Sequence, residues 1–469
     1  MYEERSVKTE HDSALEQLLF RLKAAYLEQP YTSCALRVEK LVALKSAIAN
    51  HRTELVSAAQ SDFSHRAELD TVMADMVPTV NHIGHISRNL KKWMKPDKRS
   101  PGIEFLPSQT YIEYVPKGVV GIIAPWNYPI QLSLVPLATA IAAGNKVMLK
   151  LSEYTPNVNT VIRSILACLS EDCVVVEGDG QIGIRFSELP FDHVFFTGST
   201  HVGRKVYQAC AKNLVPVTLE LGGKSPVIVL NDANIDKVVL DLAFAKRMNC
   251  GQICVAPDYV LVHQAVYEQF VHKLKEHLKR PNKYESSTGL LTDDHKSRLA
   301  AMLQQAESKG LEVWHSKPLE TATADDFGVH LVFDPPSGLQ VMQEEVFGPI
   351  LNIFKVTDLE HAQSIIRSTE TPLACYLYTE NKCAQNDIKY RLACGSLSIN
   401  DMLLHVAVAD LPFGGVGSSG FGQYHSIEGF KTFSHGKGVF ISSAHAWRSK
   451  MFDKYSHIIG KLLTWLYLK

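Results

Sequence analysis

The sequence predicts an α/β fold built on parallel sheets and divided into two or three domains. The chain has 469 residues, which is too long for one hydrophobic core. From residue 118 onward, apolar strand-like runs alternate with stretches of helical periodicity. The first run, 119–124, is apolar throughout, as expected of a strand buried on both faces. This alternation favours right-handed crossovers between parallel strands, the doubly wound arrangement typical of nucleotide binding.

Composition narrows the classes of function. The chain is 46% hydrophobic and 21% charged with a formal net charge of -1, so no nucleic-acid partner is expected. Nine cysteines without repeated spacing argue against a disulfide framework. Cys250 and Cys254 lie four residues apart, which is not the C-x-x-C spacing of a zinc site, and no metal is expected. The first residues are charged, so no secretory signal is expected and a reducing cytoplasm is favoured.

The region before the sheet is predicted to be helical. Between about 14 and 90, apolar residues recur at helical spacing, and we assign these helices to packing alone. A turn-rich linker is expected at 95–102, which contains two prolines and a glycine. Alternation within 105–115 indicates a strand, and we expect a hairpin there that leaves its domain to reach a partner subunit.

The α/β region is divided into elements by its periodicity. The expected strands are 119–124, 146–150, 173–177, 193–196, 217–220, 225–230 and 259–263. The expected helices are 131–143, 158–169, 236–245, 267–279 and one within 291–310. A second α/β unit begins near residue 225 and extends to about residue 400. The glycine-rich stretch 414–420 is predicted to be a flexible loop.

The stretch 249–258 contains two thiols between a predicted helix and a predicted strand. A thiol at such a junction can face a cleft, where it can ionise and act as a nucleophile. Most cysteines, however, are small buried hydrophobic residues. Cys254 is therefore a candidate nucleophile, with core packing as the alternative.

Two loops that follow predicted strands contain polar residues with a chemical use. In Pro125-Trp-Asn-Tyr-Pro129, the neutral amide of Asn127 can donate to an oxyanion, and a two-proline turn is the alternative. In Lys150-Leu-Ser-Glu153, both charged groups can hydrogen-bond ribose hydroxyls. The alternative is a solvated helix start capped by Ser152.

A third loop joins a strand end to a helix start. Phe195-Phe-Thr-Gly198-Ser199 is followed by Thr-His-Val-Gly203. A helix N-terminus offers unpaired N–H groups and a positive dipole end, which suit a pyrophosphate. The spacing is G-x-x-x-x-G rather than G-x-G-x-x-G, so a plain tight turn is the alternative.

Two acidic stretches complete the set of motifs. Glu220-Leu-Gly-Gly223 closes a strand, and its carboxylate can act as a general base where glycines let a ligand approach. Gln343-Glu-Glu345-Val-Phe347 places an acid beside an aromatic residue. The alternatives are a solvated acid at a strand end and a surface acid run next to one core aromatic.

In combination and order, these motifs resemble the aldehyde dehydrogenase superfamily. The matching motifs, which span 118–420, are Pro-Trp-Asn-Tyr-Pro, Lys-x-Ser-Glu, Phe-Thr-Gly-Ser-Thr, Glu-Leu-Gly-Gly-Lys, Gly-Gln-x-Cys and Glu-Glu-Val-Phe-Gly-Pro. Stretches around Cys254, Asn400 and 411–422 resemble its class 3 branch, which includes fatty aldehyde and coniferyl aldehyde dehydrogenases. The resemblance implies a Rossmann-like dinucleotide-binding domain, an α/β catalytic domain and a small oligomerisation hairpin.

The resemblance also implies domain limits. The dinucleotide-binding domain would span 1–219, with the hairpin near 103–116. The catalytic domain would span 220–400. Residues 401–469 would return to the dinucleotide-binding domain and supply an oligomerisation strand and a tail.

The resemblance implies one role for each candidate residue. Cys254 would be the nucleophile that forms a thiohemiacetal and then a thioester, Asn127 would hold the oxyanion, and Glu220 would activate the hydrolytic water. The residues implied at the cofactor are Trp126, Lys150, Glu153, Gly198, Ser199, Gly203, Glu345 and Phe347. NAD is the implied cofactor, with NADP possible, and no metal is implied.

The implied reaction converts an apolar or aromatic aldehyde into a carboxylic acid. The alternatives are an acylating enzyme that passes the thioester to coenzyme A, and a catalytically silent scaffold on the same fold. The implied assembly is a homodimer. Leu151 departs from the branch, which often has proline there, and Cys250 either packs or forms a disulfide with Cys254 under oxidation.

The end of the chain has an apolar face at helical spacing that includes Ile458, Leu462 and Leu466. Lys461 interrupts this run, which is too short to span a membrane. We expect this tail to dock on the body or a partner subunit, with peripheral membrane contact as the alternative.

Overall fold

The computed structural model describes residues 10–63, 65–102, 105–280, 288–443, 445 and 447–468. These residues fall into two compact units. The first unit comprises 1–93 and 116–434, and the second comprises 94–115 and 435–469.

The first sheet lies in the first unit. Its strands in the described residues are β3 (Val119–Ile123), β4 (Lys146–Lys150), β5 (Cys173–Val176), β6 (His193–Gly198), β7 (Val217–Leu221) and β15 (Gly420–Phe421). Their order is β15-β7-β6-β3-β4-β5, and the pairs are parallel except β15 with β7. The chain therefore starts this sheet at its centre and builds outward in two directions, as in doubly wound folds.

Helices cover both faces of the first sheet. On one face, α1 (Glu10–Glu28), α7 (Gly180–Ser187) and α8 (Thr200–Ala211) share a core with alternate strand residues such as Met148 and Phe196. On the other face, α5 (Gln131–Ala143) is buried along its whole length. It is covered by α2 (Cys34–Asn50), α4 (Val77–Trp93) and α15 (Ser426–Thr432). Gly144, with φ of 95°, ends α5 in a conformation that favours glycine.

The second sheet also lies in the first unit. Its described strands are β8 (Ser225–Val229), β9 (Pro257–His263), β10 (Val313–His315), β11 (His330–Phe333), β12 (Ile350–Val356), β13 (Ala374–Tyr378) and β14 (Ser396–Ile399). Their order is β10-β11-β12-β9-β8-β13-β14, and the pairs are parallel except β10 with β11.

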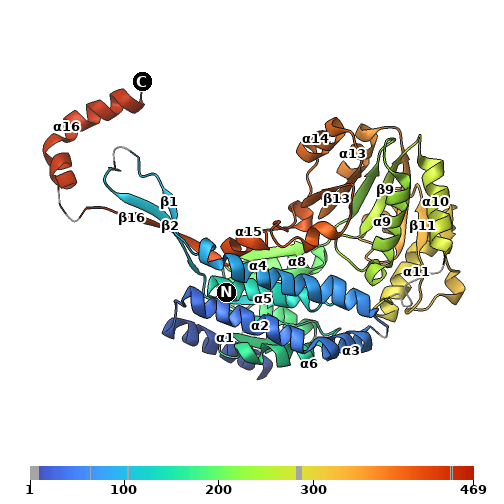
Figure 1. Ribbon diagram of the computed structural model, residues 1–469, viewed down its shortest axis with the longest axis horizontal. Helices are drawn as coiled ribbons and strands as arrows, with labels where there is room; N and C mark the ends of the chain where they lie inside the picture. The colour runs from blue at the N-terminus through green and yellow to red at the C-terminus, as the bar shows by residue number, and fades with distance from the viewer. Residues whose placement is uncertain are drawn as a thin grey trace, which may run out of the picture. The chain divides into compact units, whose positions relative to one another are not determined.

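This second sheet is also covered on both faces (Figure 1). On one face, α13 (Leu359–Arg367) and α14 (Lys382–Arg391) share a core with Ile228 and Leu261, and α11 (Asp293–Ser308) packs on Val332 and Ile350. On the other face lie α9 (Ile235–Arg247) and α10 (Tyr267–Lys279). A 2.6 Å hydrogen bond from Tyr378 Oη to Asp241 of α9 ties that helix to the face opposite the first core.

The remaining described elements of the first unit are short or peripheral. They are α3 (Arg52–Asp62), the π-helix η1 (Asp70–Met76), α6 (Pro156–Ile165), η3 (Leu166–Leu169), η4 (Met248–Gly251), η5 (Leu319–Thr321), α12 (Gln340–Gln343), η6 (Leu404–Ala407) and η7 (Gly417–Ser419).

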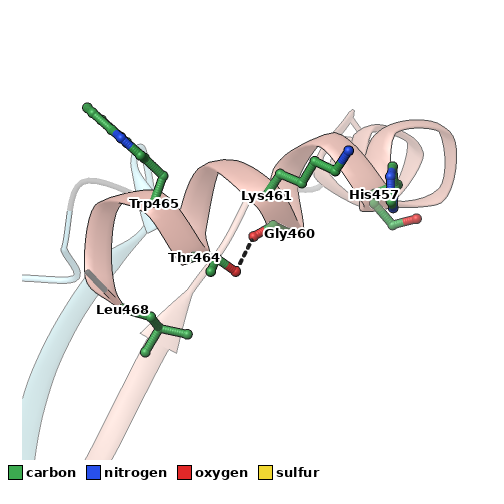
Figure 2. Close-up of a pocket in the computed structure, with 7 residues that line it drawn as sticks. His457, Gly460, Lys461, Thr464, Trp465 and Leu468 are labelled. Atoms are coloured by element: carbon green, nitrogen blue, oxygen red, sulfur yellow. Dashed lines mark hydrogen bonds between the residues drawn. The ribbon is translucent and has the colours of Figure 1, made fainter.

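The second unit holds a three-stranded sheet and a long helix. The strands are β1 (Asp97–Arg99), β2 (Gln109–Pro116) and β16 (Ser434–Ile441), in the order β1-β2-β16. Helix α16 (Trp447–Tyr467) is kinked at Tyr455 and buries none of its described residues. Figure 2 shows a hollow along α16 lined by Ser456, His457, Gly460, Lys461, Thr464, Trp465 and Leu468, where Thr464 Oγ donates to the Gly460 carbonyl at 2.8 Å.

The predicted fold class is confirmed, and most predicted elements lie within a few residues of their observed bounds. One prediction about elements was wrong. The linker 95–102 contains β1, which pairs antiparallel with β2 from Asp97 opposite Ile112 to Arg99 opposite Thr110. The helix predicted at 158–169 is observed as α6 followed directly by the 3-10 helix η3. Residues 103 and 104 of the predicted hairpin lie outside the described residues.

Candidate active site

The topology brings the candidate catalytic residues to the edge where the two sheets face each other. Asn127 follows β3, and Glu220 lies near the carboxyl end of β7. Cys254 precedes β9, and Glu345 precedes β12. The Cys254 thiol interacts electrostatically with both carboxylates, so loops and strand ends of both sheets of the first unit contribute to one site.

A left-handed turn precedes the Cys254 thiol. Asn249, Cys250 and Gly251 have φ values of 47°, 54° and 69°. This conformation costs roughly 1–2 kcal/mol for each residue other than glycine. A Cβ at Gly251 would lie 2.6 Å from the carbonyl oxygen of Gly348, so the turn packs tightly against the loop before β12.

Burial and negative charge both disfavour the Cys254 thiolate. Burial, followed by the nearby Glu345 and Glu220, raises the pKa of this thiol to about 12. The thiol is therefore neutral at neutral pH until positive charge or a base reaches it. Cys250 is also a free buried thiol, and it packs in the apolar core beneath α11.

Asn127 is fixed at both its main chain and its side chain. Its amide Nδ2 donates to the Gln252 carbonyl at 3.1 Å. Its carbonyl accepts from Arg66 Nη1 at 3.0 Å and from Asn249 Nδ2 at 3.1 Å. The amide therefore lies against the loop that carries the thiol, where a donor to an oxyanion is required.

Glu220 is a buried carboxyl group without a hydrogen-bond partner among the described residues. Its side chain is 3% exposed, and both carboxyl oxygens lack a partner. Burial raises the pKa of Glu220 well above its usual value. Opposite it in the sheet is Gly420, where a Cβ would lie 1.9 Å from the Leu219 carbonyl oxygen. A carboxyl group with a raised pKa and free oxygens can take a proton from water.

Glu345 lies against the glycines that follow β7. Its carboxylate accepts the Gly223 N–H, and a Cβ at Gly222 would come within 1.8 Å of Oε2. Burial and the nearby Asp258 raise the pKa of Glu345 to about 8. Glycine at 222 is therefore required for this close approach.

An aromatic cluster lies beside the Glu345 loop. Trp126 makes edge contacts with Phe347 at a centroid distance of 5.6 Å and with His295 at 5.9 Å. His295 stacks on Phe347 at 6.3 Å. Burial, together with the charge of Arg298, lowers the pKa of His295 to about 4, so its ring is neutral and can pack as an aromatic.

The ends of β4 and β6 carry the remaining candidates. Lys150 ends β4, and its Nζ lies 2.8 Å from Glu153 Oε2. Gly198 ends β6, and Ser199 caps α8 by accepting the Val202 N–H at 3.4 Å. The first N–H groups of α8 have no partner within the helix, which suits an anion.

Gly203 has a packing reason for its identity. A Cβ at this position would lie 2.4 Å from Leu221 Cδ2 of β7, so glycine lets α8 approach the sheet. Its contact with a cofactor stays a prediction.

These residues fit a bound dinucleotide. The Lys150–Glu153 pair, the α8 N-terminus and the Gly222–Glu345 contact follow one edge of the first sheet, where doubly wound folds bind such ligands. The partnerless carboxyl group of Glu220 adds an acceptor near the thiol.

Comparisons with known proteins agree with this geometry. The aldehyde dehydrogenase family model matches residues 7–439. The chain belongs to the aldehyde dehydrogenase family. It is therefore an NAD(P)-dependent aldehyde dehydrogenase that oxidises an aldehyde to a carboxylic acid.

Three matches illustrate where this aldehyde dehydrogenase lies in the family. A probable coniferyl aldehyde dehydrogenase of Pseudomonas aeruginosa is 40% identical over 462 residues, which cover 97% of this chain and 96% of that protein. A dimeric NADP-preferring aldehyde dehydrogenase of Canis lupus familiaris is 33% identical, with coverage of 92% and 95%. A substrate-bound structure of Staphylococcus aureus AldH matches with a TM-score of 0.87, 35% identity and coverage of 96% and 99%.

Several residues at the site of this aldehyde dehydrogenase were not predicted from sequence. They are Arg66, Asp70 and His295, which contact the Asn127 loop, the thiol loop or the aromatic cluster. Residues 14–90 were assigned to packing, and within that range the Arg66 side chain donates a hydrogen bond to the Asn127 carbonyl. No local pattern marks these residues, since their partners lie far away in the sequence.

In the described part of the chain, no helix is long and apolar enough to cross a membrane. No group of His, Cys, Asp or Glu in that part could hold a metal ion.

Proposed function

We propose that Cys254, Asn127 and Glu220 carry out the reaction. Once its proton has passed to solvent, the Cys254 thiolate adds to the aldehyde carbonyl, and the thiohemiacetal oxyanion is held by the Asn127 amide and the Cys254 N–H. A bound NAD would supply the hydride acceptor that lets this adduct become a thioester. Glu220 then takes a proton from the water that hydrolyses the thioester.

The single observation that carries this proposal is that Glu220 is buried without a hydrogen-bond partner among the described residues. A buried carboxyl group with neither oxygen hydrogen-bonded is costly to maintain for stability alone. Glu220 interacts electrostatically with Cys254, so this carboxyl group lies near the place where the thioester would form. A role in hydrolysis would explain why the unfavourable burial is kept. A hydrolytic base there disfavours the coenzyme A alternative, since water would consume the thioester first.

The cofactor contacts in this proposal follow the edge of the first sheet. Lys150 and Glu153 bind the adenosine ribose, and Ser199, with Gly198 and Gly203, forms the pyrophosphate site. Glu345 binds the nicotinamide ribose, while Trp126 and Phe347 line the cleft. NAD is the preferred cofactor and NADP is usable, because Glu153 repels a 2′-phosphate and Lys150 attracts it.

The substrate in this proposal is an apolar or aromatic aldehyde. The support is the similarity to a relative named for coniferyl aldehyde.

The protein works as a homodimer in the cytoplasm. The support for the dimer is the similarity to a relative that is named as dimeric. The domain limits 1–219, 220–400 and 401–469 are part of the same proposal. So is docking of α16 on the body or a partner subunit, with peripheral membrane contact as the alternative.

The test is an aldehyde panel assayed with each cofactor. Aromatic propenals, long alkanals and a short hydroxyaldehyde are incubated with NAD or NADP without coenzyme A, and NADH or NADPH absorbance is recorded. The acid product is identified by mass spectrometry. We expect the aromatic and long aldehydes to give the highest kcat/KM, and Cys254→Ala to abolish the reaction. Acid formation that requires coenzyme A would contradict the assigned hydrolysis.

A further inference from the structure

We propose that Arg66 and Asp70 are positioning residues. Together they would fix the Asn127 amide, which holds the oxyanion, relative to the loop that carries Cys254. This inference rests on the proposed roles of Asn127 and Cys254. Both residues lie in the segment that leads into the π-helix η1, which begins at Asp70. π-Helical turns are rare and frequently occur at functional sites.

Arg66 holds the main chain of Asn127. Its side chain is fully buried, and Nη1 donates to the Asn127 carbonyl at 3.0 Å. The guanidinium lies 4.3 Å from the Phe63 ring centroid and 5.4 Å from that of Tyr128, which fixes its plane. Its Nε and Nη2 have no hydrogen-bond partner among the described residues. The buried Asp75 carboxylate, 3.7 Å from Nη2, offsets the charge. Among the described residues, the hydrogen bond that this side chain makes is the one to Asn127.

Asp70 holds the strained turn before the nucleophile. Its Oδ2 accepts the Asn249 N–H at 2.9 Å and also the hydroxyl of Thr288. Asn249 is the first left-handed residue of the turn. Without this anchor, the turn would lose the contact that offsets its unfavourable backbone conformation.

Asn249 joins the two contacts into one network. Its Nδ2 donates to the carbonyls of Asn127 and Gln252, each at 3.1 Å. The Gln252 carbonyl also accepts from Asn127 Nδ2 at 3.1 Å. Asn249 Nδ2 and the Gln252 carbonyl thus connect the residue proposed to hold the oxyanion, Asn127, to the loop that carries the thiol.

Asp75 of η1 fixes the other end of the Asn127 loop. It accepts the Gln131 N–H at 2.5 Å and the Ile130 N–H at 3.4 Å, at the start of α5. Its Oδ2 lies 3.7 Å from Arg66 Nη2. One short segment therefore determines where the Asn127 amide lies relative to Cys254.

Four variants and one control test the proposal. Arg66→Met removes both the charge and the donor, whereas Arg66→Lys keeps the charge and a donor but not the planar fork. Asp70→Ala removes the acceptor, whereas Asp70→Asn keeps an oxygen that can accept both bonds. The matched control is Arg52→Met, which breaks an exposed ion pair with Glu68 in the same region. We measure kcat and KM with aldehyde, NADH affinity by fluorescence, and the rate of Cys254 alkylation by iodoacetamide.

The expected pattern separates positioning from folding. Arg66→Met and Asp70→Ala should lower kcat by about 10- to 100-fold, since a displacement near 1 Å costs up to about 100-fold. NADH affinity should stay within about twofold, because these residues do not touch the proposed cofactor contacts. Asp70→Asn should recover most of kcat, and Arg52→Met should match the wild type. Asp70→Ala should also change the alkylation rate, because it frees the turn that carries the thiol.

Two results would overturn the proposal. One is a folded Arg66→Met enzyme with wild-type kcat. The other is an Asp70→Asn enzyme as impaired as Asp70→Ala. If Arg66→Met does not fold, the pair Asp70→Ala and Asp70→Asn decides, because these variants leave the buried charge of Arg66 in place. If the wild type oxidises no aldehyde, the proposed function fails, and an unchanged alkylation rate in Asp70→Ala would still refute the positioning role.

Discussion

At the scale of single residues, the division of work between Cys254 and Glu220 is the central prediction. Glu220→Gln keeps the shape of the side chain but cannot accept a proton. Losing one general base typically costs about 100- to 10,000-fold in the step it serves. If that step is hydrolysis, stopped-flow should show a burst of NADH followed by slow turnover. Unchanged turnover would remove the base from the mechanism, and loss of the burst would mean that Glu220 also activates the thiol.

A pH profile gives a second prediction about the same carboxyl group. Burial raises the pKa of Glu220, so its basic form becomes available only as the pH rises. Steady-state turnover limited by hydrolysis should therefore increase through neutral pH, whereas Glu220→Gln should give a flatter profile. A wild-type rate that falls over that interval would contradict the assignment.

The same shift has a consequence for stability. The unfolded chain releases this proton at the ordinary glutamate pKa, while the folded protein retains it to higher pH. The free energy of unfolding should therefore fall as pH rises above that ordinary value, in proportion to the proton difference. Urea unfolding of the wild type and Glu220→Gln at several pH values measures the difference.

Cofactor choice gives the third prediction. Glu153 lies 2.8 Å from Lys150, so the pair can accept a ribose hydroxyl and oppose a phosphate. Glu153→Gln should raise kcat/KM with NADP by several-fold relative to NAD, because the repulsive charge is gone. A wild type that strongly prefers NADP, with the same preference in Glu153→Gln, would refute this role.

Candidate catalytic residues could be named from the sequence, whereas the residues that contact them could not. Cys254, Glu220 and Asn127 lie in short motifs, and residues of this kind could be found one motif at a time. The hydrogen bond between Arg66 and Asn127 joins distant parts of the chain. No local sequence pattern around either residue predicts this bond. Left-handed Asn249 and Cys250 were also missed, because only tertiary contacts fix that turn.

At the scale of elements, helix-to-sheet packing gives the fourth prediction. Gly203→Ala would place a Cβ 2.4 Å from Leu221, whereas Gly183 in α7 has nothing within 4 Å of its added Cβ. Gly203→Ala should destabilise by about 1–3 kcal/mol through overpacking. Gly183→Ala should be neutral or stabilise by about 0.5–1 kcal/mol through helix propensity. Denaturant midpoints of the two variants compare them directly, and equal midpoints would contradict the tight α8 contact.

Strands buried on both faces were the most predictable elements. β4 is fully buried and was located to the residue, because its sequence is apolar apart from its terminal lysines. β1 was missed because charged residues after a proline favour a turn, and its pairing with β2 outweighs that preference. The π-helix η1 was missed because its register depends on Asp70 and Asp75 reaching distant backbone groups.

At the scale of the whole molecule, assembly is the fifth prediction. The chain has a mass of 52.2 kDa, and the second unit presents a sheet and an exposed apolar helix that a partner subunit could cover. Light scattering at micromolar concentration should give about twice the chain mass, and removal of 447–469 should shift the equilibrium toward the monomer. A monomeric full-length protein would exclude the homodimer.

The three-stranded sheet also imposes an order on synthesis. Its strands β1 and β2 leave the ribosome early, whereas β16 lies near the end of the chain. At typical translation rates of about 5–20 residues per second, the β2 edge waits roughly 15–65 seconds for its neighbour. During that interval the nascent chain displays an unpaired strand edge that can join another chain. Slower translation before β16, or depletion of chaperones that shield nascent chains, should therefore lower the soluble yield while leaving the activity of each folded molecule unchanged.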